Sequence, residues 1–69
     1  MNAYRLVLVY QDGASEHTGV VICADDARAQ AAARDLLDAH VQVRAVEIHD
    51  ERGSVRLVER AAPVRAMAG

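Results

Sequence analysis

Residues 24–40 constrain the fold most, because they are the only stretch of this chain with the periodicity of a helix. Asp25 and Asp26 precede a run of good helix formers, and either carboxylate suits the free N–H groups and positive dipole at a helix start. At about 100° per residue, one face is formed by Ala29, Ala32, Ala33, Leu36, Leu37 and His40. Because alanine buries little area, we expect the strands to supply most of the core.

Strand patterns flank this helix on both sides. Residues 4–10 are rich in β-branched and aromatic side chains and are apolar on both faces, which is typical of a central strand. Asp12-Gly13 marks a hairpin turn, and Gly53 in a second polar turn is free to take positive φ. The four predicted strands cover residues 4–10, 18–24, 41–50 and 54–60.

The element order is therefore ββαββ, in the α+β class. Placing the first strand between the second and the third makes every neighbour antiparallel, centres the doubly apolar strand and allows a right-handed crossover. This favours a four-stranded antiparallel sheet in the order 2-1-3-4 with the helix packed on one face. The order 1-2-4-3 is the alternative. Residues 1–61 form the predicted single domain, and residues 62–69, with a proline and no periodicity, a predicted flexible C-terminal tail.

The side-chain pattern also predicts a register for the last two strands. Ile48 is placed opposite Val55 and Glu47 opposite Arg56, so that apolar meets apolar and opposite charges meet. A shift by one residue would put Ile48 opposite Arg56, which the pattern disfavours.

Length and composition narrow the classes of function. A chain of 69 residues buries only about 60% of its unfolded surface, so a monomer is marginal and oligomerisation is a common remedy. The single cysteine excludes a disulfide within one chain. A net charge of −2 and only two large aromatic residues argue against a dedicated nucleic-acid binder. No secretory signal pattern and no apolar run of membrane-spanning length is present, so we expect a cytoplasmic protein without a membrane partner.

A single helix can cover only one face of a four-stranded sheet. We assign to that face Leu6, Leu8, Val21, Val46, Ile48, Val55 and Leu57. The other face then exposes more apolar surface than a soluble monomer normally keeps, formed by Val7, Val9, Val20, Ile22 and Val58. We expect a second copy of the chain to cover this patch, so that these residues form a two-fold homodimer interface.

Few residues point to chemistry. Cys23, close to the predicted helix N-terminus, is a candidate reactive thiol, although a free cysteine is more commonly a small buried hydrophobe. No spacing supplies the three or four ligands that zinc needs, the candidates being His17, His40 and His49 with Glu47 or Asp50. Neither a serine triad nor a glycine-rich phosphate loop is recognisable. We therefore expect no catalytic residues, no metal and no cofactor, and a protein that is not an enzyme.

The favoured function is a small protein–protein interaction or regulatory module, homodimeric through the open sheet face, that docks on another protein. The first alternative is a nucleic-acid-binding regulator whose anion contacts would be Arg44, Arg52, Arg56 and Arg60. Acidic residues interleave with these arginines, so a mixed-charge surface is the simpler interpretation. The second alternative is a small-molecule or metal-binding protein with a pocket enclosed by the dimer and lined by Tyr4, Tyr10 and His17.

Overall fold

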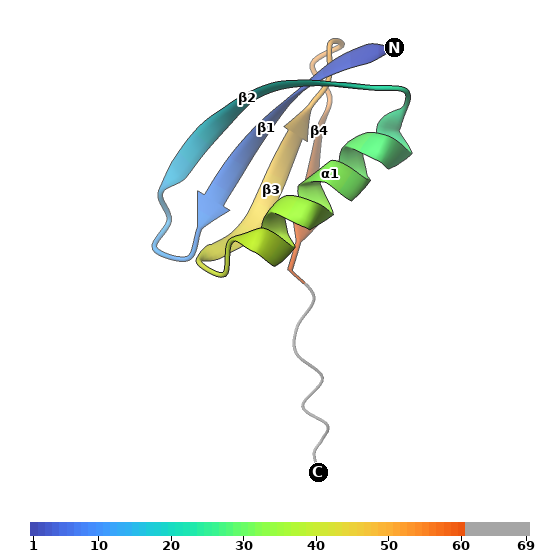
Figure 1. Ribbon diagram of the computed structural model, residues 1–69. Coiled ribbons are helices and arrows are strands. Elements are labelled where there is room, and N and C mark those ends of the chain that lie inside the picture. The colour runs from blue at the N-terminus through green and yellow to red at the C-terminus, as the bar shows by residue number, and fades with distance from the viewer. Residues whose placement is uncertain (61–69) are drawn as a thin grey trace.

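The computed structural model describes residues 1–60, which form a four-stranded sheet with a helix packed on one face (Figure 1). The elements follow the predicted order: β1 (Asn2–Tyr10), β2 (Ser15–Cys23), α1 (Asp26–Ala39), β3 (Val43–His49) and β4 (Val55–Glu59). The strand order is β2-β1-β3-β4 and every neighbouring pair is antiparallel, which confirms the fold class and the favoured order. The predicted tail, residues 62–69, lies outside the described residues.

Helix α1 begins at the two aspartates, as predicted. The Asp25 carboxylate accepts a hydrogen bond from the Arg28 backbone N–H at 2.9 Å, so Asp25 is the N-cap. Asp26 lies in the first turn, where its charge suits the helix dipole. The buried positions of the helix fall on the predicted face and are Ala29, Ala33 and Leu37.

An arginine that follows β4 donates hydrogen bonds to backbone carbonyls at the C-terminal end of α1. Arg60, just after β4, donates from Nη2 to the backbone carbonyls of Leu37, His40 and Val43 at 2.5, 2.8 and 2.9 Å. Leu37 lies in the last turn of α1, where carbonyls lack a partner within the helix, His40 is the C-cap, and Val43 is the first residue of β3. Arg60 therefore ties the last strand to the helix and to the start of β3.

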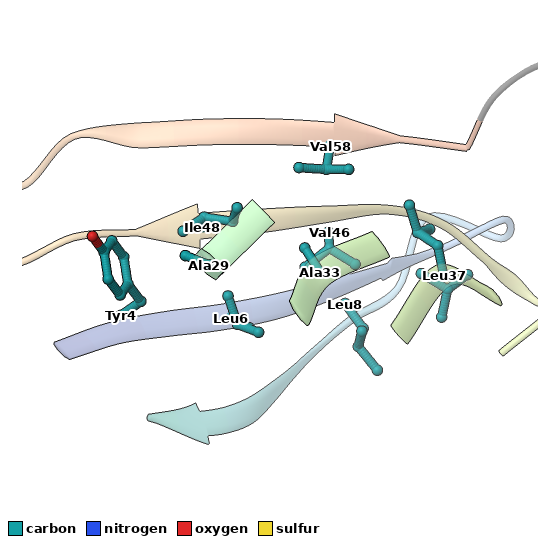
Figure 2. Close-up of a cluster of buried hydrophobic side chains, with 10 residues drawn as sticks. Tyr4, Leu6, Leu8, Ala29, Ala33, Leu37, Val46, Ile48 and Val58 are labelled. Carbon is teal, nitrogen blue, oxygen red and sulfur yellow. The ribbon is translucent and has the colours of Figure 1, made fainter. Parts of the chain in front are cut away.

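The core lies between α1 and the sheet face beneath it (Figure 2). Ala29 and Ala33 are fully buried, and their small side chains allow the helix to lie close to β3, the strand it contacts most. The strands supply most of the larger side chains, as the alanine-rich helix requires. The buried cluster comprises Tyr4, Leu6, Leu8, Ala29, Ala33, Leu37, Val43, Val46, Ile48 and Val58.

Both hairpins close around a three-residue loop that ends in a glycine. In the second hairpin the Asp50 N–H donates to the Ser54 carbonyl at 3.0 Å, and Gly53 has a φ of +88°. The first hairpin has the same arrangement, with Gly13 at +93°. A type I turn followed by a left-handed residue gives this loop, and the loop length sets the register of the strands that it joins.

The predicted register of β3 and β4 is wrong by one residue, because Ile48 lies opposite Arg56 and not opposite Val55. The prediction relied on cross-strand side-chain pairs. Placing Ile48 opposite Val55 puts His49 opposite Ser54 and leaves a four-residue loop, 50–53. The hydrogen bonds instead close the loop at Ser54, around three residues. Because side chains alternate along a strand, a shift of one residue turns every β4 side chain to the other face.

Three assignments to the sheet faces are corrected by this register. Val55 and Leu57, predicted to lie under the helix, are more than half exposed on the opposite face. Val58, predicted in the dimer interface, is instead buried in the core opposite Val46. Burial of Val58 against Val46 offsets the cost of placing the charged Arg56 on the helix side of the sheet. The Arg56 side chain remains 58% exposed there.

Strand β2 is longer than predicted and contains an irregularity. It begins at Ser15, and its register against β1 shifts between Leu6 and Val7. In this region Gly19 has a φ of +108°, and the Thr18 hydroxyl donates to the Leu6 carbonyl at 3.1 Å. Such a bulge bends an edge strand and hinders the addition of a further strand.

Candidate interaction surface

No element of residues 1–60 covers the sheet face that lies away from α1, and we call it the open face (Figure 1). Four of the five predicted interface residues lie on it, and Val55 and Leu57 occupy the place expected for the fifth, Val58. The strand pairings assign to the open face Ala3, Arg5, Val7, Val9, Ser15, His17, Val20, Ile22, Ala45, Glu47, His49, Val55, Leu57 and Glu59.

The open face has a filled centre and two exposed apolar borders. In the centre Val7 and Ala45 are only 5% and 3% exposed, because neighbours on both flanking strands surround their short side chains. The large exposed apolar side chains belong to the two outer strands: Val20 (63%) and Ile22 (62%) on β2, and Val55 (57%) and Leu57 (51%) on β4. We call these four residues the apolar edges.

Polar groups lie between the apolar edges. His49 is opposite Arg5 in the pairing of β1 with β3, and His49 Nε2 lies 2.9 Å from Glu47 Oε1. His17 is opposite Val7, and Val7 is opposite Glu47. The centre of the open face therefore carries a cation, Arg5, and an anion, Glu47, on adjacent strands.

The residues considered as metal-ligand candidates, His17, His40, His49, Glu47 and Asp50, are dispersed. They lie on the open face, after α1 and in the β3–β4 turn, so that Glu47 and His49 are the pair brought into contact. Two ligands fall short of the three that a catalytic zinc site uses. Within residues 1–60, no group of three or more His, Cys, Asp or Glu side chains is placed to hold a metal ion.

Cys23 ends β2 on the helix side of the sheet. It is half-buried and packs against the core cluster. Ala24 alone separates it from the N-cap Asp25, so the thiol does lie next to the helix N-terminus in sequence. Its contact with the core also gives Cys23 a role in packing.

The arginines of the second hairpin have different surroundings. Arg60 binds the carbonyls at the end of α1. Arg52 and Arg56 lie 3.6 and 3.9 Å from the carboxylates of Asp50 and Asp26. The fourth is the exposed Arg44. This arrangement favours a mixed-charge surface over a continuous basic patch for nucleic acid.

Both tyrosines lie on the helix side of the sheet. The Tyr4 hydroxyl donates to Asp26 Oδ1 at 2.7 Å, and the Tyr10 hydroxyl donates to Glu16 Oε1 at 2.6 Å. These hydrogen bonds to carboxylates raise the pKa of both phenols above the ordinary value for tyrosine. His17 lies on the opposite face, so the three residues predicted to line one pocket do not meet within one chain. The cavity beside Tyr4 is about 70 Å³, which is small for a ligand site.

Sequence reasoning missed the β4 edge of the open face, although a signal for it was present. Asp50 and Gly53 are typical of a three-residue loop that ends in a left-handed glycine. That loop length by itself places Val55 and Leu57 on the open face.

No helix in the described part of the chain combines the length and apolar character needed to cross a membrane. Comparison of the chain with protein-family models, with curated proteins and with solved structures finds no match.

Proposed function

We propose that this protein is a non-enzymatic interaction module that forms a homodimer through its open face and, as a dimer, docks on another protein. The observation that supports it is the pair of apolar edges, four apolar side chains that are each more than half exposed on one face. Full burial of such a side chain is favourable by roughly 1.5–3 kcal/mol. A face of this kind is typical of an interaction site.

A two-fold axis parallel to the strands, between two stacked sheets, suits the layout of the open face. With the order β2-β1-β3-β4, it sets β2 of one copy over β4 of the other, and β1 over β3. Val20 of one copy then faces Val55 of the other, because both share a row of the sheet with Arg5 and His49. In this arrangement β2 of each copy, with Val20 and Ile22, lies over β4 of the other, and Leu57 of one copy faces His17 of the other.

Charge complementarity supports the same arrangement. With β1 over β3, Arg5 of one copy lies over His49 of the other. Glu47 is two residues farther along β3, or about 7 Å, which an arginine side chain can span. Each Arg5 is then able to pair with Glu47 of the other copy, so the two-fold axis produces this ion pair twice.

The open face is large enough for such an interface. Its four strands, spaced about 4.8 Å apart and about seven residues long at about 3.3 Å per residue, outline roughly 440 Å². Two copies therefore contribute about 900 Å² when each face is treated as flat. The uneven surface of the side chains increases the accessible area that is buried. The sum approaches the roughly 1,000 Å² expected of a specific interface.

The proposed compartment is the cytoplasm, which a lone free cysteine and a mixed-charge surface favour. A partner other than a second copy would bind surfaces that the dimer leaves uncovered. These include the outer side of α1 and the edges of the sheet.

Analytical ultracentrifugation of the full chain tests the dimer, and we expect the mass of two copies at high micromolar concentration. Ile22→Glu and Leu57→Glu should each give a folded monomer, because both side chains are already exposed in the single chain. Val41→Glu is the matched control. Val41 is 75% exposed but lies between α1 and β3, away from the open face, so this variant should remain dimeric.

The ion pair has its own test. Arg5→Glu should weaken dimerisation through repulsion by Glu47 of the other copy, and combining it with Glu47→Arg should restore the dimer. A wild-type chain that is a well-folded monomer at high micromolar concentration overturns the proposal. Dissociation by Val41→Glu equal to that by Ile22→Glu overturns it as well.

A further inference from the structure

A groove runs between α1 and the outer edge of β4. Its volume of about 440 Å³ lies within the range of binding sites in proteins. Ala27, Ala31 and Arg34 line its helix side, and the small alanine side chains leave the groove open. Its strand side is lined by Arg56, Leu57 and Glu59.

The strand side of the groove presents backbone groups that β3 does not use. The Arg60 N–H donates to the Arg44 carbonyl at 3.1 Å, and the Asp50 N–H donates to the Ser54 carbonyl at 3.0 Å. The pairs Arg44–Arg60 and Asp50–Ser54 are therefore hydrogen-bonded pairs of the ladder between β3 and β4. Hydrogen-bonded and non-hydrogen-bonded pairs alternate in an antiparallel ladder. The N–H and C=O groups that point outward therefore belong to Val55, Leu57 and Glu59.

The edge of β4 suits an added strand better than the edge of β2 does. β2 contains the bulge near Gly19, which hinders further pairing. β4 pairs with β3 in an uninterrupted register from Val55 to Glu59. It also borders the groove, so that an added strand would pack against α1 as well.

The charges of the groove indicate the chemistry of its occupant. Two arginines, Arg34 and Arg56, and one glutamate, Glu59, line it, and Arg34 forms no ion pair within residues 1–60. Arg56 lies 3.9 Å from Asp26, and its side chain remains 58% exposed to a ligand. Guanidinium groups bind carboxylates with particular strength because two N–H groups can donate together.

We propose that this groove binds an extended peptide segment of another protein, which adds to the edge of β4 and places an acidic side chain between Arg34 and Arg56. The space above Ala27 and Ala31 accommodates the peptide side chains that point toward α1. The site uses the backbone of β4 and the helix side of the molecule, so it does not depend on the homodimer.

The probe is a capped synthetic peptide that alternates valine and threonine around one central glutamate. Fluorescence anisotropy with the full chain should show saturable binding, and NMR of the isotope-labelled chain should show the largest amide shifts at Val55, Leu57 and Glu59. A peptide with lysine in place of the glutamate should bind about tenfold more weakly. N-methylation of the peptide amides that face β4 should abolish binding, whereas methylation of the alternate amides should not.

Variants of the helix test the other side of the groove. Ala31→Glu fills the groove with a repelling carboxylate and Arg34→Glu reverses its charge, so each should weaken binding of the glutamate peptide. Both positions are exposed, so the fold should be kept. Arg28→Glu, another exposed helix position that does not line the groove, is the matched control and should leave binding unchanged.

Lack of peptide binding by the folded chain overturns the proposal, as do amide shifts confined to the open face. Equal affinity for the glutamate and lysine peptides overturns the acidic specificity. Unchanged binding by Ala31→Glu excludes the groove. The Ile22→Glu variant should bind the peptide as the wild type does, and a loss of binding there would contradict the independence of the two surfaces.

Discussion

Ile48 and Arg56 lie directly opposite one another in the antiparallel pair of β3 and β4. Taken alone, this pairing of an apolar with a charged residue is less favourable than Ile48 with Val55. The three-residue loop requires it, and the same register buries Val58 in the core opposite Val46, where Val58 is 8% exposed. Turn geometry and burial together outweigh one cross-strand pair.

This register can be checked by nuclear Overhauser contacts between Hα protons. Non-hydrogen-bonded pairs of an antiparallel ladder bring Cα atoms to about 4.5 Å, close enough for strong Hα–Hα contacts. We expect them between Glu47 and Leu57 and between His49 and Val55. A strong Hα–Hα contact between Ile48 and Val55 would instead support the register suggested by the charges.

Arg60→Ala should destabilise the protein through loss of the helix closure. Its guanidinium donates to the carbonyls of Leu37, His40 and Val43, and hydrogen bonds to a charged group contribute about 1.5–3 kcal/mol. We expect a loss of that size in the free energy of urea unfolding. Arg60→Lys should recover only part of it, because an ammonium group has no planar fork.

The control for Arg60 is Arg44→Ala. Arg44 is exposed on the neighbouring strand, and its substitution should change the free energy of unfolding by less than about 0.5 kcal/mol. Equal losses in the two variants would exclude the closure of α1 by Arg60.

Leu37→Ala should be far more damaging than Leu36→Ala. Leu37 is 1% exposed in the core, whereas Leu36, on the predicted sheet-facing side, is half-buried at its margin. Truncation of a fully buried leucine costs about 2–5 kcal/mol, so Leu37→Ala should lower the melting temperature strongly or unfold the chain. Thermal melts that rank the two variants in the opposite order would contradict the observed rotation of α1.

Asp50 should make stability dependent on acid pH. Backbone N–H groups of Ser54 and Arg52 donate to its carboxylate at 2.9 Å, the Ser54 bond having the larger effect, and they lower its pKa below the ordinary aspartate value of 3.8. Because the pKa of Asp50 is lower in the folded chain than in the unfolded chain, its ionised carboxylate stabilises the fold. This contribution is fully present above the pKa of the unfolded chain and is lost as the pH falls through the pKa of the folded chain.

Asp50→Ala should therefore be less stable than the wild type at neutral pH. The difference in the free energy of unfolding should narrow as the pH falls below the ordinary aspartate pKa of 3.8 and through the lower pKa of the folded chain. Urea unfolding midpoints of both proteins over a series of pH values measure this difference. A gap that stays constant from neutral to strongly acid pH would show that the Asp50 charge does not hold the turn.

The helix, the four strands and their order followed from the sequence because each depends on local or topological properties. Local interactions, between residues close together in sequence, determine three of these features. They are the helical period over residues 24–40, the Asp25 cap and the turns at the glycines. The central place of β1 followed from its two apolar faces and from the handedness of the crossover.

The tertiary structure decided which of two possible loops closes β3 and β4, and with it the faces of β4, and it alone decided the contacts of Arg60. β4 has apolar side chains at Val55 and Leu57 on one face and at Val58 on the other, so its pattern of alternation fits either orientation. The loop hydrogen bonds and burial beneath α1 resolve this ambiguity. Arg60 reaches carbonyls 17 to 23 residues away in sequence, and no local pattern encodes a contact that exists only once β4 lies beside β3 and α1.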